Sequence, residues 1–599
     1  MQHPKLSTAL AVLSLAPLFS TGNSMACSTM VVGKNVSSTG NILVGHNEDN
    51  DGRIITSQYW VPAADHAAGE MIEFEPDAAK IPQVPHTYGF YWSQTLHPAG
   101  YSYSDGFVNE NGVVIASNQS YDTYDKNESV KEGGVGYGIR RLVAERARNA
   151  RDGVDIAIAL VTKYGYRAAG RVYTIADSKE AWQINLIRGG RYIAKKIGDN
   201  EVVYVSNAYT LGVVDVKAPD VLASPDLVEH AIAMGTYKPG KPGDYSDFNF
   251  REAYQTDARR DAGWIKFRSQ TAWKILTGRE IEHSKDFPYS ITPERKLSVD
   301  DVKKVMRAHY AHEDRSNGFI HQSINDIGNL GTFDSAIFEL TPDKRFTMGW
   351  RTSGTPCENP YVPFYPLAKP SSAQAFMTPD EATRQQFHGK AESFSFRPDL
   401  DLFAYLTHQN LVDYLDHSDR LAKAIASQEK AWDDARAQVE SRARTIEKTG
   451  GAQKAMAFLH AFNANAYEEG TELVRASAKA LSRTGVIILA DELKTSGDGT
   501  ARLAVLGSPS LDARRIDPES LVITTGLPNE DIEIIKNPAK AISLEYKDVD
   551  GDGVIDAVAT FRTRLATQYA VPGSQQEIYV FGKSGGKKFA GFDVVKMAK

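Results

Sequence analysis

Residues 26–34 read Ala-Cys-Ser-Thr-Met-Val-Val-Gly-Lys, a cysteine followed at once by a run of β-forming residues. The composition of residues 28–32 predicts a short strand. A second strand is predicted at residues 41–45, and it leads into Gly-His-Asn-Glu-Asp at residues 45–49. Cys27 therefore stands immediately before the first strand of a predicted sheet.

The residues before Cys27 have the pattern of a secretion signal. Lys5 supplies a positive charge, residues 6–19 form an apolar run, and small residues at Ser24 and Ala26 fit a signal-peptidase site. Cleavage after Ala26 would make Cys27 the first residue of the mature chain. The alternative is a lipoprotein with an acylated Cys27, although that signal prefers leucine where this chain has Ser24.

An N-terminal cysteine carries a thiol and a free α-amine on one residue. The amine titrates near pH ~8, where it can act as a base. The apolar run is shorter than the roughly 20 residues that span a bilayer, and no later segment approaches that length. We therefore expect a secreted or periplasmic protein with no membrane partner once the signal is removed.

Composition excludes several classes of protein. The chain has 599 residues, enough for about three or four domains, and a net charge of −7, so the basic surface of a nucleic-acid binder is missing. Cys27 and Cys357 are the only cysteines. They could form a disulfide in an exported protein. An exposed N-terminal cysteine favours a reactive thiol instead, with Cys357 as a buried structural residue.

Patterning along the chain predicts an α+β protein. Helical spacing follows the first strands at residues 138–150 and 154–164, and strand character returns between residues 171 and 206 with a hairpin turn at Gly189-Gly190. Sheets layered against helices are expected from this order. The predicted domains are a signal peptide (1–26), a hydrolase domain (27–395), a helical extension (396–485) and a β-sandwich module (486–599).

The last two regions have a predicted structural role. Residues 419–448 carry one apolar helical stripe, Gly450-Gly451 stops the helix, and residues 453–481 complete an antiparallel helical hairpin. Beyond residue 484, short β segments alternate with Gly, Pro and Asp-rich turns. This pattern is typical of a small β-sandwich.

One turn of the β module has the spacing of a calcium loop. Residues 548–556 place glycine at loop position 6 and carboxylates at positions 1, 3, 5 and 9, namely Asp548, Asp550, Asp552 and Asp556. Ala559 stands where a glutamate is expected at position 12, and the flanks read as strands. We expect a structural calcium loop in a β-hairpin, and the alternative is an acidic turn that binds nothing.

Read together, the segments around Cys27 resemble the opening of the N-terminal-nucleophile cysteine dipeptidases, the family that includes dipeptidase A and the secernins. The resemblance extends over residues 27–481, and no single motif carries it. It rests on the shared order of several segments: residues 45–49, 109–118, 138–147, 176–182, 206–208 and 354–365. The β module resembles accessory domains of other exported bacterial proteins.

The resemblance implies an αββα sandwich in which Cys27 cleaves amide bonds without a catalytic cofactor. It also implies a role for Asn207 as an oxyanion donor, for Asn118 as a polar residue that orients the substrate or the amine, and for Asp49 as the acidic partner. A tetrahedral oxyanion requires such fixed donors.

One position departs from the pattern. His46 stands where the wider superfamily, which includes bile-salt hydrolases and penicillin V acylases, has an arginine, and we expect His46 and Asn47 to contact substrate. Arg268 is the candidate for the missing charge.

The predicted activity is hydrolysis of small peptides, most plausibly dipeptides with a free amino end. The alternatives are an acylase of N-acyl amino acids or conjugated bile acids, and a non-enzymatic calcium-dependent surface-binding protein.

Overall fold

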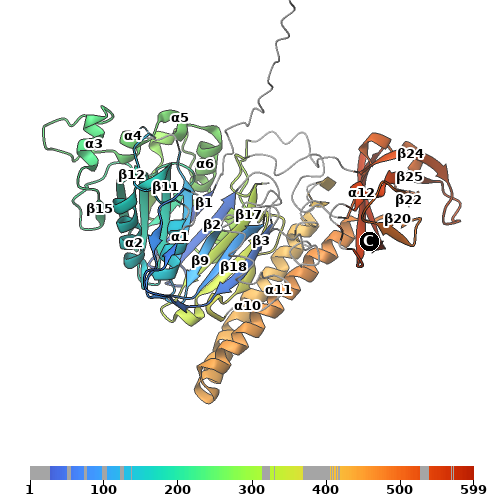
Figure 1. Cartoon of the computed structure of the whole chain (residues 1–599), viewed down its shortest axis with the longest axis horizontal. Helices are drawn as coiled ribbons and strands as arrows, with labels where there is room; N and C mark the ends of the chain where they lie inside the picture. Colours follow the sequence, from blue (N-terminus) through green and yellow to red (C-terminus); the bar gives the residue numbers. More distant parts are fainter. Residues whose placement is uncertain are drawn as a thin grey trace, which may run out of the picture.

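The computed structural model of the chain contains two large antiparallel sheets, a long helical hairpin and a C-terminal β module (Figure 1). The predicted signal segment, residues 1–26, lies outside the described residues. The structure describes residues 27–49, 55–72, 77–96, 104–121, 124, 127–136, 138–312, 324–329, 331–368, 405, 408, 411–412, 414–415, 419–525, 539–567, 570 and 572–598.

The first sheet has seven strands and begins with the strand that follows Cys27. Every residue of this strand is buried, as its run of β-forming residues predicts. The strand pairs with β2 on one side and β14 on the other. In spatial order the sheet contains β16 (Ser290–Ile291), β14 (Val202–Val205), β1 (Ser28–Val32), β2 (Ile42–Asp49), β17 (Thr332–Leu340), β18 (Met348–Ser353) and β19 (Val362–Phe364).

The second sheet has eight strands, and all its pairings are antiparallel. The predicted hairpin at Gly189-Gly190 joins two of them, and Gly189 has a φ of 87°, which favours glycine. In spatial order they are β15 (Val221–Ala223), β13 (Tyr192–Ile197), β12 (Ala181–Gly189), β11 (Tyr166–Ala176), β10 (Val114–Gln119), β9 (Ser104–Asn109), β8 (Phe90–Leu96) and β3 (Ile55–Val61).

Helices cover one face of each sheet. Helices α1 (Gly138–Arg146) and α2 (Ala150–Tyr164) share a buried cluster with the second sheet. Helices α6 (Gly263–Thr277) and α7 (Val299–Met306) share another with the first sheet. A third cluster contains side chains of both sheets, including Val31 and Val114. The predicted α+β class is therefore confirmed, and the facing sheets bring β1 and β10 together.

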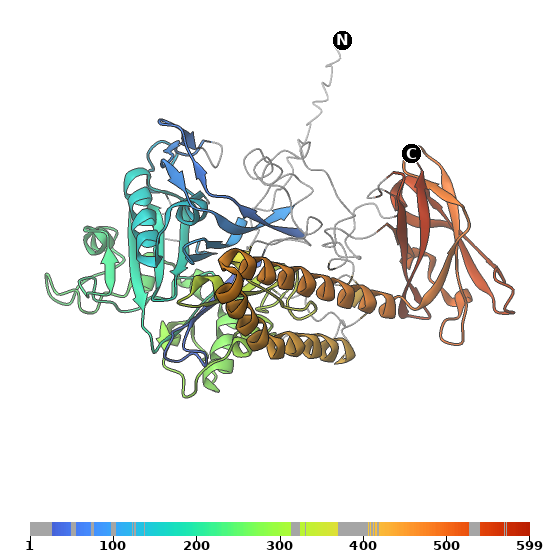
Figure 2. The same ribbon diagram turned by 90° about the horizontal axis from the view of Figure 1, so that it is seen from below.

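The helical extension is a hairpin of two long helices, α10 (Asp419–Gly450) and α11 (Ala452–Leu481). Gly451 between them has a φ of 86°, so the predicted glycine stop is confirmed. The hairpin packs on the first sheet through Ala443 and Leu459, and Ala478 joins a cluster of the C-terminal module. Figure 2 shows α11 reaching that module. No helix among the described residues is both long and apolar enough to cross a membrane.

The C-terminal module, for which the sequence predicts a small β-sandwich, is built of β-strands. Its strands form one sheet, and an additional parallel pairing of β20 with β27 joins the sheet into a closed ring. Gly591 permits this closure, because a Cβ there would collide with the carbonyl oxygen of Thr484. The order is β20 (Thr484–Ile488), β22 (Thr500–Val505), β25 (Asp556–Arg562), β24 (Ala539–Lys547), β23 (Val522–Thr524), β26 (Gln575–Ser584), β27 (Lys587–Ala598) and β21 (Glu492–Lys494).

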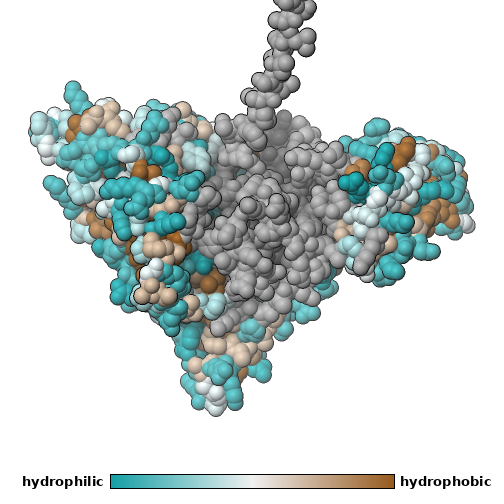
Figure 3. All heavy atoms as spheres, in the orientation of Figure 1, coloured by the Kyte–Doolittle hydropathy of each residue, from teal (hydrophilic) through white to brown (hydrophobic). Residues whose placement is uncertain are grey.

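The visible surface is mostly hydrophilic over both the sheet domain and the module, with scattered apolar residues (Figure 3). Exposed apolar side chains such as Val213 and Ile542 come from different regions of the chain. Isolated apolar residues of this kind are normal on globular proteins.

Candidate active site

Cys27 lies at the start of β1 and is 1% exposed. Side chains alternate along a strand, so Cys27 shares the side of Thr29 and Val31, which faces the second sheet. Cys27 and Cys357 are both thiols, so the disulfide alternative is wrong. Cys357 is half-buried, and its Sγ lies 3.4 Å from Nε2 of His309, so it is less enclosed than expected.

Arg268 of α6 connects the predicted site residues. Its guanidinium donates to the backbone oxygen of Cys27 at 2.9 Å and to Oδ1 of Asn207 at 2.9 Å. The same group lies 4.0 Å from the carboxylate of Asp49. Arg268 is fully buried, and that burial lowers its pKa. An arginine remains charged in spite of such a shift, so a fixed cation stands beside Cys27.

Asn207 follows the end of β14 and is completely buried. Its Nδ2 donates to the backbone oxygen of Gln119, at the end of β10, at 2.9 Å. Since its Oδ1 accepts from Arg268, the orientation of the side-chain amide is defined by both neighbours. Asn207 thus joins the ends of the two sheets, and an NH₂ group has a second hydrogen available for another acceptor.

Asp49 ends β2 and is 1% exposed. Its oxygens accept from Oγ1 of Thr332 at 2.5 Å and from Nδ2 of Asn329 at 3.0 Å. Burial raises the pKa of Asp49 to about 6, and the nearby Arg268 opposes that rise. Asp49 is therefore a buried member of the Arg268 cluster and not a surface carboxylate.

This raised pKa predicts that Asp49 makes the free energy of unfolding depend on pH. The ordinary pKa is 3.8, so the folded state favours the protonated form, and stability from this group is lost as pH rises through about 6. The loss amounts to about 3 kcal/mol at the conversion of 1.36 kcal/mol per pKa unit. In denaturant unfolding, the stability of Asp49→Asn relative to the parent should therefore rise between pH 4 and pH 7.

The control for this measurement is Asp498→Asn, because Asp498 is exposed on the C-terminal module. Its stability difference from the parent should stay within about 0.5 kcal/mol across the same pH range. An Asp49→Asn difference that is equally flat would contradict the burial argument.

His46 and Asn118 meet through a residue that the sequence did not indicate. Oγ1 of Thr29 donates to Oδ1 of Asn118 at 2.6 Å and lies 2.7 Å from Nδ1 of His46. A hydroxyl has one hydrogen, so Thr29 must accept from Nδ1–H of His46. Nε2 of His46 in turn lies 3.1 Å from the carboxylate of Glu48, which is 2% exposed.

His46 bridges Thr29 and Glu48, and the roles of its ring nitrogens depend on its tautomer. With Glu48 ionised, both ring nitrogens of His46 donate, and an imidazole that donates from both nitrogens is an imidazolium cation. His46 would then carry positive charge on the face of the first sheet toward which Cys27 also points. Glu48 was missed from the sequence, although the period-two alternation from His46 gives the signal that would have found it.

The side chain of Asn47 is held by three hydrogen bonds. Its Nδ2 donates to the backbone oxygens of Met306 and Ile327, each at 2.9 Å, and its Oδ1 accepts from Oγ of Ser335 at 2.6 Å. It is completely buried on the opposite side of β2 from His46. Asn47 therefore anchors β2 to the end of α7.

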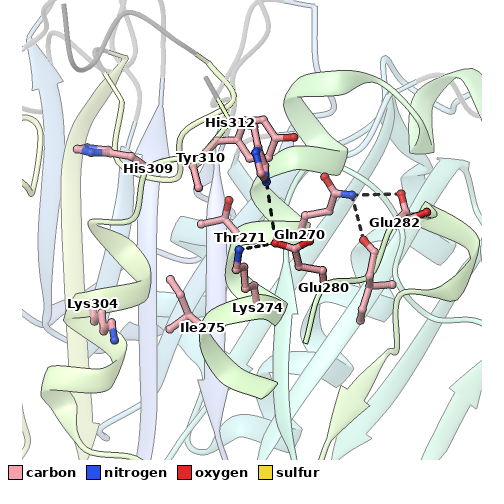
Figure 4. Close-up of a pocket in the computed structure, with 12 residues that line it drawn as sticks. Gln270, Thr271, Lys274, Ile275, Glu280, Glu282, Lys304, His309, Tyr310 and His312 are labelled. Atoms are coloured by element: carbon pink, nitrogen blue, oxygen red, sulfur yellow. Dashed lines mark hydrogen bonds and ion pairs between the residues drawn. The ribbon is translucent and has the colours of Figure 1, made fainter. Parts of the chain in front are cut away.

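A separate pocket of about 480 Å³ lies along α6 and α7 (Figure 4). Glu280 interacts there with Lys274 and His312, and none of the predicted catalytic residues lines the pocket. It is therefore distinct from the Cys27 cluster.

The acidic loop of the C-terminal module gathers three of its four predicted ligands. Carboxylate oxygens of Asp548, Asp550 and Asp552 lie within 4.8 Å of one another. The fourth, Asp556, is buried, and its two oxygens accept from the backbone N–H groups of Gly507 and Val549. These bonds fix the base of the loop.

Known proteins match this chain over the region that carries the cluster. The model of peptidase family C69 matches residues 26–394. A probable dipeptidase of Latilactobacillus sakei is 26% identical, over 74% of this chain and 93% of its own length. A probable dipeptidase B of Streptococcus pyogenes serotype M1 is 25% identical, over 61% and 76%. A probable dipeptidase A of the same serotype is 25% identical, over 57% and 75%.

Proposed function

The chain belongs to peptidase family C69, and on that premise we propose that it is an exported cysteine dipeptidase whose nucleophile is the N-terminal thiol of Cys27. The two facing sheets with their outer helices form, on this proposal, the αββα sandwich of an N-terminal-nucleophile hydrolase. The names of the relatives support small peptides as substrates.

One observation carries the proposal: Arg268 binds the backbone oxygen of Cys27 and the side-chain oxygen of Asn207 while it faces Asp49. The buried guanidinium of Arg268 is a fixed charge. It joins the residue that carries the thiol nucleophile to the residue that carries the amide donor. Acyl transfer requires this combination, because negative charge develops on the substrate oxygen beside the attacking sulfur.

The first half of the reaction forms a thioester. The α-amine of Cys27 accepts the thiol proton, and Sγ attacks the carbonyl carbon of the peptide bond. The electron pair of the C=O bond moves to oxygen, where the second N–H of Asn207 can stabilise it. Collapse of this intermediate breaks the C–N bond, and the leaving amine takes the proton from the α-ammonium.

The second half consumes water. The α-amine now accepts a proton from water as the water oxygen attacks the thioester, and collapse expels the thiolate of Cys27, which recovers the proton. Arg268 stays protonated throughout and acts by holding Cys27 and Asn207. We propose that Arg268 supplies the charge for which the wider superfamily uses an arginine, while His46 holds Thr29 beside Asn118.

Export is part of the proposal because the amine appears only after residues 1–26 are removed. The destination is the periplasm or the exterior.

The acidic loop supports a structural role for calcium in the C-terminal module, held by Asp548, Asp550 and Asp552. Adding 1 mM calcium is expected to raise the melting temperature of the full mature protein by about 2–4 °C. The double variant Asp548→Asn with Asp550→Asn should not show this rise. An equal rise in that variant would contradict the proposed calcium site.

The activity is tested with a matched substrate panel. The mature protein is incubated with an Ala-Ala dipeptide, its N-acetylated form and a glycine-conjugated bile acid, and the released amine is quantified. The proposal predicts hydrolysis of the unblocked dipeptide at least about tenfold faster than the other two, measured as kcat/KM. Preference for either blocked substrate would favour the acylase alternative.

A further inference from the structure

Arg259 is a second buried arginine beside Asn207. It belongs to the short helix α5 (Asp257–Arg260) and is 8% exposed. Its Nε donates to the backbone oxygen of Asn207 at 3.0 Å, while Arg268 donates to the side-chain oxygen of the same residue at 2.9 Å. Both carbonyl oxygens of Asn207 therefore accept hydrogen bonds from guanidinium groups.

Two aromatic rings hold the guanidinium of Arg259 in place. Its central carbon lies 4.6 Å from the ring centre of Trp264 and 5.8 Å from that of Tyr121. The ring of Trp264 also carries Arg268, at 5.1 Å. Planar guanidinium groups stack well on such rings. Arg259 and Arg268 are thus fixed relative to each other through Trp264.

The chain around α5 connects the ends of two strands from different sheets. The side chain of Gln255 accepts from the backbone N–H of Tyr209 at 2.9 Å and donates to the backbone oxygen of Tyr121 at 3.0 Å. Tyr209 lies two residues beyond Asn207, and Tyr121 lies three beyond Asn118. This segment therefore restrains the two strand ends that carry the predicted donor and its polar neighbour.

We propose that Arg259 is a positioning residue that holds Asn207 in place as the oxyanion donor by fixing its backbone oxygen. The inference rests on the proposed function, which assigns that role to Asn207. Charge-assisted hydrogen bonds are roughly twice as strong as neutral ones. Arg259 restrains the backbone of Asn207, and Arg268 restrains the plane of its side-chain amide. A donor that is fixed before the reaction stabilises the transition state more than the bound substrate.

The test compares Arg259→Met and Arg259→Lys with Arg251→Met in the mature protein. Arg251 is an apt control because it is also 8% exposed and donates to backbone oxygens, but those of Phe287 and Lys285. The readouts are kcat, KM and inhibition by a dipeptide aldehyde. The aldehyde adds to a thiol as a thiohemiacetal whose oxygen occupies the oxyanion position.

Arg259→Met is expected to lower kcat about 10- to 100-fold and to weaken the aldehyde by a similar factor, with KM changed less than about threefold. Arg259→Lys, which keeps the charge without the Nε–H and the planar group, should show a smaller loss of the same kind. Arg251→Met should stay within about threefold of the parent in all three readouts.

Three results would overturn the inference: an Arg259→Met effect no larger than that of Arg251→Met, a rise in KM alone, or full activity in Arg259→Lys. If Arg259→Met does not fold, the lysine variant with an unchanged melting temperature decides. Asn207→Ala separates the two levels, since full activity in that variant would overturn the proposed function itself. Its loss of activity beside an active Arg259→Met would overturn only the role of Arg259.

Discussion

Replacing Cys27 with alanine should reduce dipeptide hydrolysis by the mature protein by at least about 10⁴-fold, because no other group in the cluster can form the thioester. Arg268 lacks a lone pair for attack, and Asn207 is a neutral amide. The measurement is the rate of amine release at saturating dipeptide, together with a melting curve that establishes folding. The hydrogen bond from Arg268 to residue 27 uses the backbone oxygen, so the variant keeps that contact.

Cys357→Ala is the matched control. It removes the other thiol of the chain, whose Sγ lies 3.4 Å from Nε2 of His309. Its kcat should stay within about threefold of the parent. Activity that survives in Cys27→Ala and disappears in Cys357→Ala would show that Cys357 is the nucleophile, and it would contradict the proposal.

A single glycine added in front of Cys27 should lower kcat by about 10²- to 10⁴-fold, the range that a general base contributes. The thiol, Arg268 and Asn207 are unchanged in such a protein, but the nitrogen of Cys27 becomes an amide and can no longer accept a proton. The experiment compares mature chains that begin at Cys27 and at the added glycine, produced by the same protease.

The rate of thiol alkylation serves as the control for access to Cys27. Equal alkylation with lost hydrolysis would isolate the missing amine. Undiminished hydrolysis by the extended chain would show that another group is the base.

The sequence was sufficient to predict the parts of this fold that depend on local pattern. The buried strand Ser28–Val32 and the two long helices with Gly451 between them follow from β-forming composition, helical spacing and a glycine stop. Closure of the C-terminal sheet could not be predicted, because the parallel pairing of β20 with β27 joins segments about 100 residues apart. Only the three-dimensional path brings those edges together.

The candidate site divides in the same way. Cys27, Asp49, Asn207 and Arg268 were found from a resemblance, and the structure brings them together. The substrate contact expected of Asn47 stays a prediction. Strand alternation reverses the direction of adjacent side chains, and the packing of β2 against α7 shows that Asn47 lies on the α7 side. Arg259 was missed since it acts through a backbone oxygen and belongs to a four-residue helix with no repeating pattern.

The central claim is that Cys27 is both the N-terminal residue and the site of acylation. Mass spectrometry of the mature protein, quenched with acid during turnover of a slowly hydrolysed dipeptide ester, tests both parts in one peptide map. Our account predicts an N-terminal peptide that begins at Cys27, carries no lipid and bears the acyl group on Sγ. A chain that begins upstream of Cys27, a lipid on Cys27 or an acyl group on Cys357 would contradict it.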